Sequence, residues 1–232
     1  MNQNYGTGMD VAVADLGVDA RATFITKTYS HLLGAVVGFT LIEVLLFSSG
    51  LAYPMASAML GVSWLFILGG FVIVSWLASS MAHRAESTAV QYLALIGFVI
   101  AEAIIFVPLL ALADAVAPGA IQSAAVVTAV GFGILTGVVL ITRKDFSFLK
   151  GILMWGFVAA LVAIVAAVMF NLDLGAYFSM AMIALASGAI LYKTSNVVHH
   201  YPQDRYVAAS LELFASVALL FWYVLRLFLS RR

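Results

Sequence analysis

Four charged side chains lie inside or at the edge of long apolar stretches of this 232-residue chain. Glu43 and Glu102 each fall well within an apolar run, whereas Lys193 and Glu212 end one run and begin the next. A charged group in hydrocarbon is costly, so such residues usually form pairs, take up protons or line a path for ions. Ion pairing, proton relay and cation binding are therefore the chemistry that these residues offer.

The first two acids, Glu43 and Glu102, are predicted to lie at a similar depth. Counted from the same face of the membrane, they are about seven and ten residues deep, roughly 10 and 15 Å at 1.5 Å per residue. If the two carboxyls meet in a poorly solvated space, they share a proton and can bind a divalent ion or relay protons. Arg226 is an alternative partner for either acid. A purely structural role stays open beside ion transport.

The other two charges, Lys193 and Glu212, are separated by a short polar turn. Because one apolar segment ends where the next begins, both residues lie at the same face of the membrane. This predicts an ion pair between the two segments. The net stabilisation depends on whether the Coulomb attraction exceeds the desolvation of both groups. In the alternative, Lys193 extends alone to the lipid headgroups.

Motifs for covalent or metal-assisted catalysis are not found in the sequence. There is no HExxH or GxSxG motif and no Ser/His/Asp order typical of a hydrolase. His199 and His200 are neighbours in a polar turn with Asp204, without the i,i+4 spacing that presents two ligands on one helix face. The chain also has no cysteine. We expect no enzyme activity and no cofactor, and we expect solvated loop histidines.

The composition is that of a polytopic membrane protein. Hydrophobic residues make up 64% of the chain and charged residues 9%, and the mean hydropathy is +1.10. A formal net charge of zero and the lack of a basic stretch argue against nucleic-acid binding. A membrane helix needs about 20 apolar residues. This length predicts seven helices at about residues 29–47, 59–78, 89–110, 120–141, 151–170, 174–192 and 208–229.

The regions between the predicted helices are short. Residues 1–26 have no signal-peptide pattern and are predicted to be a mobile tail, either a simple tether or a handle for a partner. Residues 27–232 form the bundle. Pro54 is expected in a short loop, and Pro108 is expected to kink its helix or end it early.

Basic residues beside the predicted helices indicate the orientation, because Lys and Arg favour the cytoplasmic side. Alternating helices bring eight of them to one side, and the amino terminus is therefore predicted to be cytoplasmic. These eight are Arg21, Lys27, Arg84, Arg143, Lys144, Lys150, Lys193 and Arg205. Arg226, Arg231 and Arg232 oppose an outside carboxyl terminus, but we favour a full seventh crossing over a re-entrant segment because 208–229 is long enough.

Three stretches, KTYSHLLGA, ITRKDFSFLKGILMWG and SGAILYKTSNVVHH, resemble the Bax inhibitor-1 family, most closely its bacterial YccA-like branch. The loop with Arg143, Lys144 and Asp145 is the most distinctive part of the resemblance. The resemblance to the family covers the chain from about Phe24 onward. The resemblance implies an all-α bundle in the bacterial inner membrane, with the last helix central and the other six wrapped around it as two three-helix layers.

The resemblance implies two activities. Some members are pH-sensitive calcium leaks, and the YccA-like branch binds and restrains a membrane AAA protease of the FtsH type. Leak-type members close their pore with two aspartates, which correspond here to Lys193 and Ser216. Arg84 is the approximate counterpart of the arginine that latches those aspartates, and it loses its acidic partners here. Glu212 lies one turn before Ser216 on the same helix face, so it can form a replacement latch with Lys193.

The sequence therefore favours a membrane protein that binds and modulates an FtsH-type protease in membrane protein quality control and the stress response. The alternative is a cation leak or exchanger, with calcium as the transported ion. A purely stabilising membrane component is a third possibility. The lipid bilayer is the one certain partner, and no oligomeric state is predicted.

Overall fold

The computed structural model of the chain describes residues 12–15, 17–84 and 87–230. Within these residues it is all-helical, with a 3₁₀ turn at Val13–Asp15 and eight α-helices. Seven of the helices are long and apolar enough to cross a membrane, as the sequence predicts. The helices are α1 (Val18–Ser48), α2 (Ala52–Leu60), α3 (Trp64–Arg84), α4 (Thr88–Val116), α5 (Ala120–Thr142), α6 (Leu149–Phe170), α7 (Gly175–His199) and α8 (Tyr206–Leu229).

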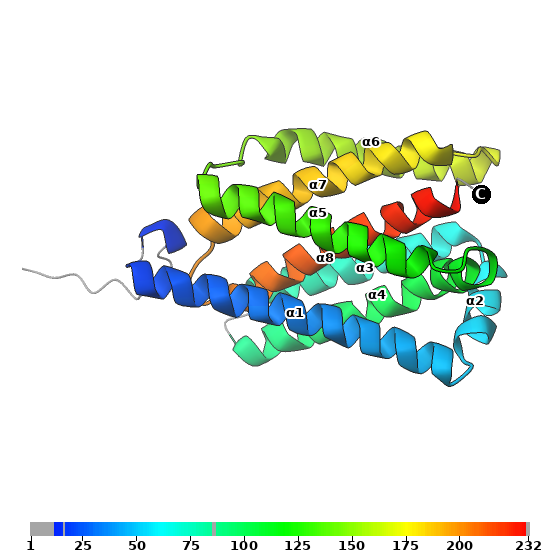
Figure 1. The fold of residues 1–232 in the computed structure, drawn as a ribbon, viewed down its shortest axis with the longest axis horizontal. Helices are drawn as coiled ribbons and strands as arrows, with labels where there is room; N and C mark the ends of the chain where they lie inside the picture. The colour runs from blue at the N-terminus through cyan, green and yellow to red at the C-terminus, as the bar shows by residue number, and fades with distance from the viewer. Residues whose placement is uncertain (1–11, 16, 85–86, 231–232) are drawn as a thin grey trace, which may run out of the picture.

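The last helix, α8, is central. Figure 1 shows α8 between one layer of α1, α3 and α4 and another of α5, α6 and α7. It lies directly against α1, α3, α4, α5 and α7, whereas α6 reaches it through side chains, with Ala160 packed near Tyr223. Small and aliphatic side chains on several faces of α8 permit this, and Ala208, Ala209 and Leu213 are fully buried. The predicted central helix and two three-helix layers are confirmed.

A second helix, α4, is almost as buried as α8. In their most apolar windows 61% of α4 and 67% of α8 is buried, against at most 28% for the other five spanning helices. α4 packs against α1, α2, α3 and α8. Because α4 is apolar on all faces, its sequence alone does not distinguish contact with protein from contact with lipid. Burial of α4 also places Glu102 in the protein interior, where it is 5% exposed.

The amino-terminal tail is shorter than predicted. α1 begins at Val18, so residues 18–26 belong to a helix and not to a mobile tail. The side chains of Val13 and Phe24 are 0% and 1% exposed and pack into the core. Arg21 donates hydrogen bonds to the carbonyl oxygens of Val13 and Ala14. These tertiary contacts stabilise a polar stretch that has no strong helical pattern of its own, and residues 1–11 lie outside the described part.

Two expectations about proline also change. The predicted loop around Pro54 contains the short helix α2, which tolerates Pro54 in its first turn because that amide has no partner within the helix. α2 packs its Ala52 and Ala56 against Val107 of α4. α4 continues through Pro108 to Val116, which excludes the early helix end, one of the two outcomes expected at this proline.

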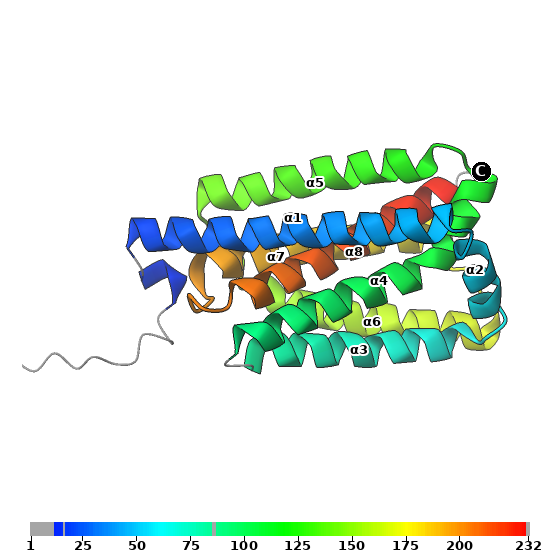
Figure 2. The same cartoon turned by 90° about the horizontal axis from the view of Figure 1, so that it is seen from below.

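The bundle has two ends of different composition (Figures 1 and 2). One, here called the α7–α8 end, holds the turn between those helices and the start of α1. The other, the α2 end, holds α2 and the last residues of α8. α8 runs the length of the bundle, so the end of the described chain lies opposite to the start of α1. The eight basic residues predicted to share one side all fall at the α7–α8 end, and Arg226 falls at the α2 end.

Candidate functional site

The ion pair predicted between Lys193 and Glu212 is present at the α7–α8 end. The ammonium Nζ of Lys193 donates to Oε2 of Glu212 and so joins α7 to α8. The two side chains are 26% and 17% exposed. They are therefore only partly desolvated, which limits both the cost of burial and the strength of the attraction.

A third helix joins this pair through His83, which the sequence did not indicate. Nε2 of His83 lies 3.1 Å from Oε1 of Glu212. Its other ring nitrogen, Nδ1, lies 2.8 Å from the carbonyl oxygen of Ser79 and must donate, because a carbonyl only accepts. A hydrogen bond between His83 and Glu212 then requires a proton on Nε2 as well, or on the carboxyl. The contact thus joins α3 to α8 at this carboxylate.

The buried phenol of Tyr201 lies against the same histidine. Its hydroxyl is 3.3 Å from Nε2 of His83, and the side chain is 8% exposed. Burial, and then the negative charge of Glu212, raise the pKa of Tyr201 well above its ordinary value. The backbone of Tyr201 accepts a hydrogen bond of 2.9 Å from the amide of Val13. The amino-terminal segment is therefore fastened over the turn that carries this tyrosine.

The other two residues of the predicted latch do not join the side-chain network. Ser216 is 6% exposed and donates to the backbone carbonyl of Glu212 at 3.0 Å, a bond within α8. Arg84 is exposed and forms no ion pair with any residue that the structure describes. His83, the residue before it, is the group that reaches Glu212. The charged network at the α7–α8 end is therefore Lys193, Glu212 and His83, with Tyr201 beside them.

The loop with Arg143, Lys144 and Asp145 is anchored on the end of α7. Arg143 ends α5 in the left-handed conformation (φ 52°), and this turns the chain toward α7. The fully buried Ser195 of α7 then accepts from the amide of Phe146 at 2.9 Å and donates to Asp145 at 3.2 Å. Arg143 and Lys144 themselves stay exposed. Of the three motif residues, only the acid holds the loop in place.

Asp145 is the centre of a local hydrogen-bond network. It accepts from the Ser147 hydroxyl, from the Ser147 amide at 2.8 Å and from Nε2 of His200 at 3.1 Å. These bonds favour the carboxylate and lower its pKa well below the ordinary range, with the Ser147 hydroxyl as the largest cause. His200 therefore has fixed partners while its side chain stays 49% exposed, as expected of a solvated histidine, whereas His199 ends α7 with its Nδ1 3.0 Å from the carbonyl oxygen of Ser195.

Ser147, His200 and Asp145 bring together the residue types of a hydrolase triad, but not its geometry. The Ser147 hydroxyl lies 2.9 Å from Nε2 of His200, and the Asp145 carboxylate contacts the same nitrogen. In a triad the serine and the acid bind opposite ring nitrogens, so that the acid orients the base. Here the serine also donates directly to the acid. The cluster is arranged to hold a loop and not to activate a nucleophile.

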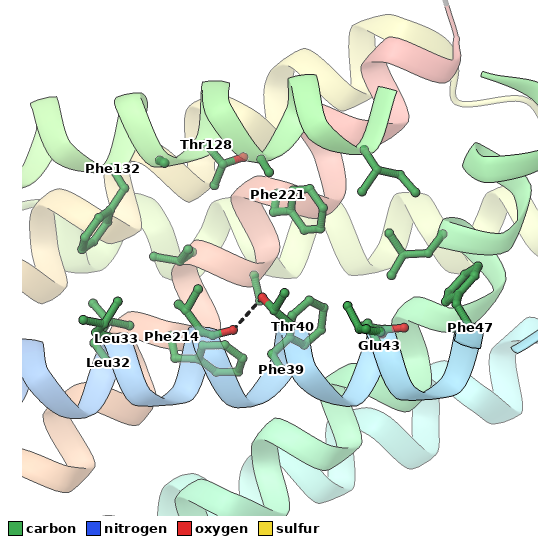
Figure 3. A pocket seen from close by; sticks show the side chains of 18 of the residues that line it. Leu32, Leu33, Phe39, Thr40, Glu43, Phe47, Thr128, Phe132, Phe214 and Phe221 are labelled. Atoms are coloured by element: carbon green, nitrogen blue, oxygen red, sulfur yellow. Dashed lines mark hydrogen bonds between the residues drawn. The ribbon is translucent and has the colours of Figure 1, made fainter. Parts of the chain in front are cut away.

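Glu43 lies in the wall of a cavity of about 650 Å³. Figure 3 shows it on α1, with Thr128 of α5 on the far side of the cavity. Glu43 is 7% exposed, and neither of its carboxyl oxygens has a hydrogen-bond partner in the described part of the chain. The Thr128 hydroxyl is likewise buried and without a partner.

Glu102, the other predicted member of this level, does not line the cavity. It is not hydrogen-bonded to Glu43, and Arg226 forms an ion pair with neither acid. Across the described residues there is no cluster of three or more His, Asp or Glu side chains that could hold a metal ion. The structure thus places both acids inside the bundle, without joining them into the divalent-ion site that the sequence suggested.

One comparison places the chain among known proteins. A family model described as "Bax1-I: Inhibitor of apoptosis-promoting Bax1" matches residues 21–232. The match spans all seven long helices except the first three residues of α1. No curated protein sequence matches the chain significantly.

Proposed function

The chain belongs to the Bax inhibitor-1 family, and we propose that it binds and modulates a membrane AAA protease of the FtsH type. It acts in the quality control of membrane proteins, in the bacterial cytoplasmic membrane, with its amino terminus in the cytoplasm. The orientation is supported by the eight basic side chains gathered at the α7–α8 end, since Lys and Arg favour the cytoplasmic side. The YccA-like motifs, which resemble those of protease-binding members, support the activity.

The observation that carries this choice over conduction is the contact between Lys193 and Glu212. Leak-type members hold two acids in this region, which repel each other when both are ionised. Here a base and an acid attract each other, and His83 ties them to α3. The α7–α8 end is thus held together by opposite charges. An end of the bundle whose helices are held in fixed positions can present a constant surface to a binding partner.

The exposed loop that contains Arg143 and Lys144 lies at the same end. It is the first part of that surface to test for binding of the protease. Arg143 and Lys144 are exposed and the anchoring contacts are made by Asp145, so replacing both by alanine leaves the loop anchored. Tagged protein is isolated from crosslinked native membranes, and the protease is quantified by mass spectrometry. We expect the double variant to recover less protease than the wild type. A matched control is Ile141→Ala, an equally exposed apolar side chain at the end of α5.

Activity is measured by reconstituting purified protein with an FtsH-type protease in liposomes. We expect the chain to slow degradation of a membrane-protein substrate, and the Arg143→Ala, Lys144→Ala variant to slow it less. Deletion of residues 1–11 tests the remaining part of the predicted handle and keeps Val13 in place. Unchanged proteolysis together with no recovery of the protease would exclude the proposed function.

A calcium or cation leak is the second candidate, favoured by the two acids buried within α1 and α4. Calcium flux into liposomes that contain the protein alone distinguishes it from the first. Flux with a steep dependence on pH, lost in Glu43→Gln and Glu102→Gln, would reverse the order of the two candidates.

A further inference from the structure

The cavity beside Glu43 opens toward the lipid between α1 and α5. The backbones of these two helices are not in contact, although Tyr29 and Phe132 pack with ring centroids 6.4 Å apart, and α8 closes the cavity from behind with Phe214 and Phe221. Leu33 and Val44 line it from α1 and are still 64% and 56% exposed. Because these side chains line the cavity and are also exposed on the lipid-facing side of the bundle, the cavity opens laterally. A molecule dissolved in the bilayer can therefore enter without passing through water.

The size and lining of the cavity fit a small molecule with a long apolar part. Its volume of about 650 Å³ lies within the ~300–1,000 Å³ typical of ligand sites. The wall runs along α1 from Tyr29 to Phe47, about 27 Å at 1.5 Å per residue. Nearly all of this wall is aliphatic or aromatic. An extended hydrocarbon chain fits such a slot, whereas a helix about 10 Å in diameter does not.

The carboxyl groups of the wall are its acidic side chains, and its other polar groups are neutral hydroxyls. Its two ionisable acids are Glu43 within the slot and Asp114 toward the α2 end, where the carboxylate accepts from Tyr53 at 2.6 Å. Among the residues that the structure describes, no lysine, arginine or histidine lines the cavity. The field in the slot therefore attracts cations and opposes anionic lipids and fatty acids.

Glu43 is the group that lacks a partner. An unsatisfied buried carboxyl costs several kcal/mol unless a donor reaches it. Both oxygens are buried, and the terminal torsion of a glutamate is broad, so rotation of the side chain can bring one of them to a ligand in the cavity that Glu43 lines. The unpaired hydroxyl of Thr128 is a second polar group in the same wall.

We propose that this cavity binds a lipophilic amine: a single long hydrocarbon chain with a cationic ammonium head. The ammonium donates to the Glu43 carboxylate, and Asp114 attracts it on entry from the α2 end. The chain lies along α1 toward Tyr29 and packs against Phe132 and Phe214. Neither the charged network at the α7–α8 end nor binding of a protease is needed for this site.

The test uses the full-length protein in phosphatidylcholine nanodiscs and radiolabelled hexadecylamine as the probe. We expect saturable binding, and at least a tenfold weaker affinity in Glu43→Gln, as for loss of a charge-assisted hydrogen bond. Hexadecanol and palmitate are added as test competitors, each at the same concentration. The alcohol should compete weakly and the fatty acid should not compete, because the wall carries acids only.

Glu102→Gln is the matched control, since it removes an equally buried acid that does not line the cavity. Its affinity should stay within twofold of the wild type. Ala125→Phe fills the slot from α5 and should abolish binding while thermal unfolding shows a folded protein. Three outcomes overturn the site: non-saturable partitioning, equal loss in the two glutamine variants, or competition by palmitate as strong as by the amine.

Discussion

His83 of α3 approaches Glu212 of α8 to 3.1 Å on the side of the carboxylate opposite to Lys193. One acid thereby joins three helices at the end of the bundle where the basic residues gather. The charge of Glu212 is balanced by Lys193, and His83 adds a second contact to the same carboxylate. This relationship leads to the first two predictions.

Replacing Glu212 by glutamine should destabilise the protein, because Lys193 and His83 lose their shared acceptor. We expect a loss of about 1–2 kcal/mol, less than for a fully buried pair because both side chains are partly exposed. Thermal unfolding of the detergent-solubilised protein measures it. The double variant Lys193→Met, Glu212→Gln should recover part of the loss, and strictly additive losses would show that the pair is not coupled.

His83 and Arg84 are neighbours with different roles in the structure. His83→Leu should lower the unfolding free energy by up to about 1 kcal/mol, since it removes the contact between α3 and α8. Arg84→Leu should leave the unfolding free energy nearly unchanged, because Arg84 has no ion pair among the described residues. Equal effects of the two substitutions in the same unfolding assay would contradict the assignment of His83 to the network.

Asp145 should make stability depend on pH in the acidic range. Its hydrogen bonds lower the pKa in the folded state, so they contribute stability above the unfolded pKa of about 3.9. That contribution is lost as the pH falls from about 4 toward the folded value. The difference in unfolding midpoint between wild type and Asp145→Asn should therefore be constant from pH 5 to 7 and shrink below pH 4. Ser147→Ala should reduce the difference; a difference that grows on acidification would refute the assignment.

Ser195 should control the mobility of the loop that follows α5. Ser195→Ala leaves the Phe146 amide without its acceptor and removes one donor to Asp145, a loss of about 1–3 kcal/mol. Hydrogen exchange of residues 143–148 should accelerate accordingly. Ser210→Ala is the control, because Ser210 is equally buried but bonds only to the carbonyl of Val207 within α8. Slow exchange in Ser195→Ala would mean that other contacts hold the loop.

The predicted helices agree with the structure where an apolar run is bounded by charges or by glycine. Residues 120–141 and 151–170 became α5 and α6 within two residues of the predicted bounds. The predictions failed where tertiary packing, and not the local residue pattern, determines the secondary structure. Residues 18–26 are helical because Phe24 is buried against Tyr201, and the loop around Pro54 became α2 because its alanines pack on α4.

The residues of the candidate site were likewise predictable from the sequence only in part. Lys193 and Glu212 were predictable, because they lie close to a single turn and have opposite charge. His83 was not, because it is distant in sequence and its approach depends on how α3 leans on α8. The sequence pointed equally to Glu43 and Glu102, but only the packing of α1, α5 and α8 leaves a cavity beside Glu43.

By itself, the sequence determined that this chain crosses a membrane seven times, that its basic residues gather at one end and that it resembles the Bax inhibitor-1 family. Hydropathy and charge act locally along the chain, and a bilayer converts them directly into helices and orientation. The tertiary structure decided which helices are buried, which acid has partners and where a cavity opens. Those properties depend on which faces of different helices meet, and in a chain that is apolar on nearly every face the pattern of residues does not specify them.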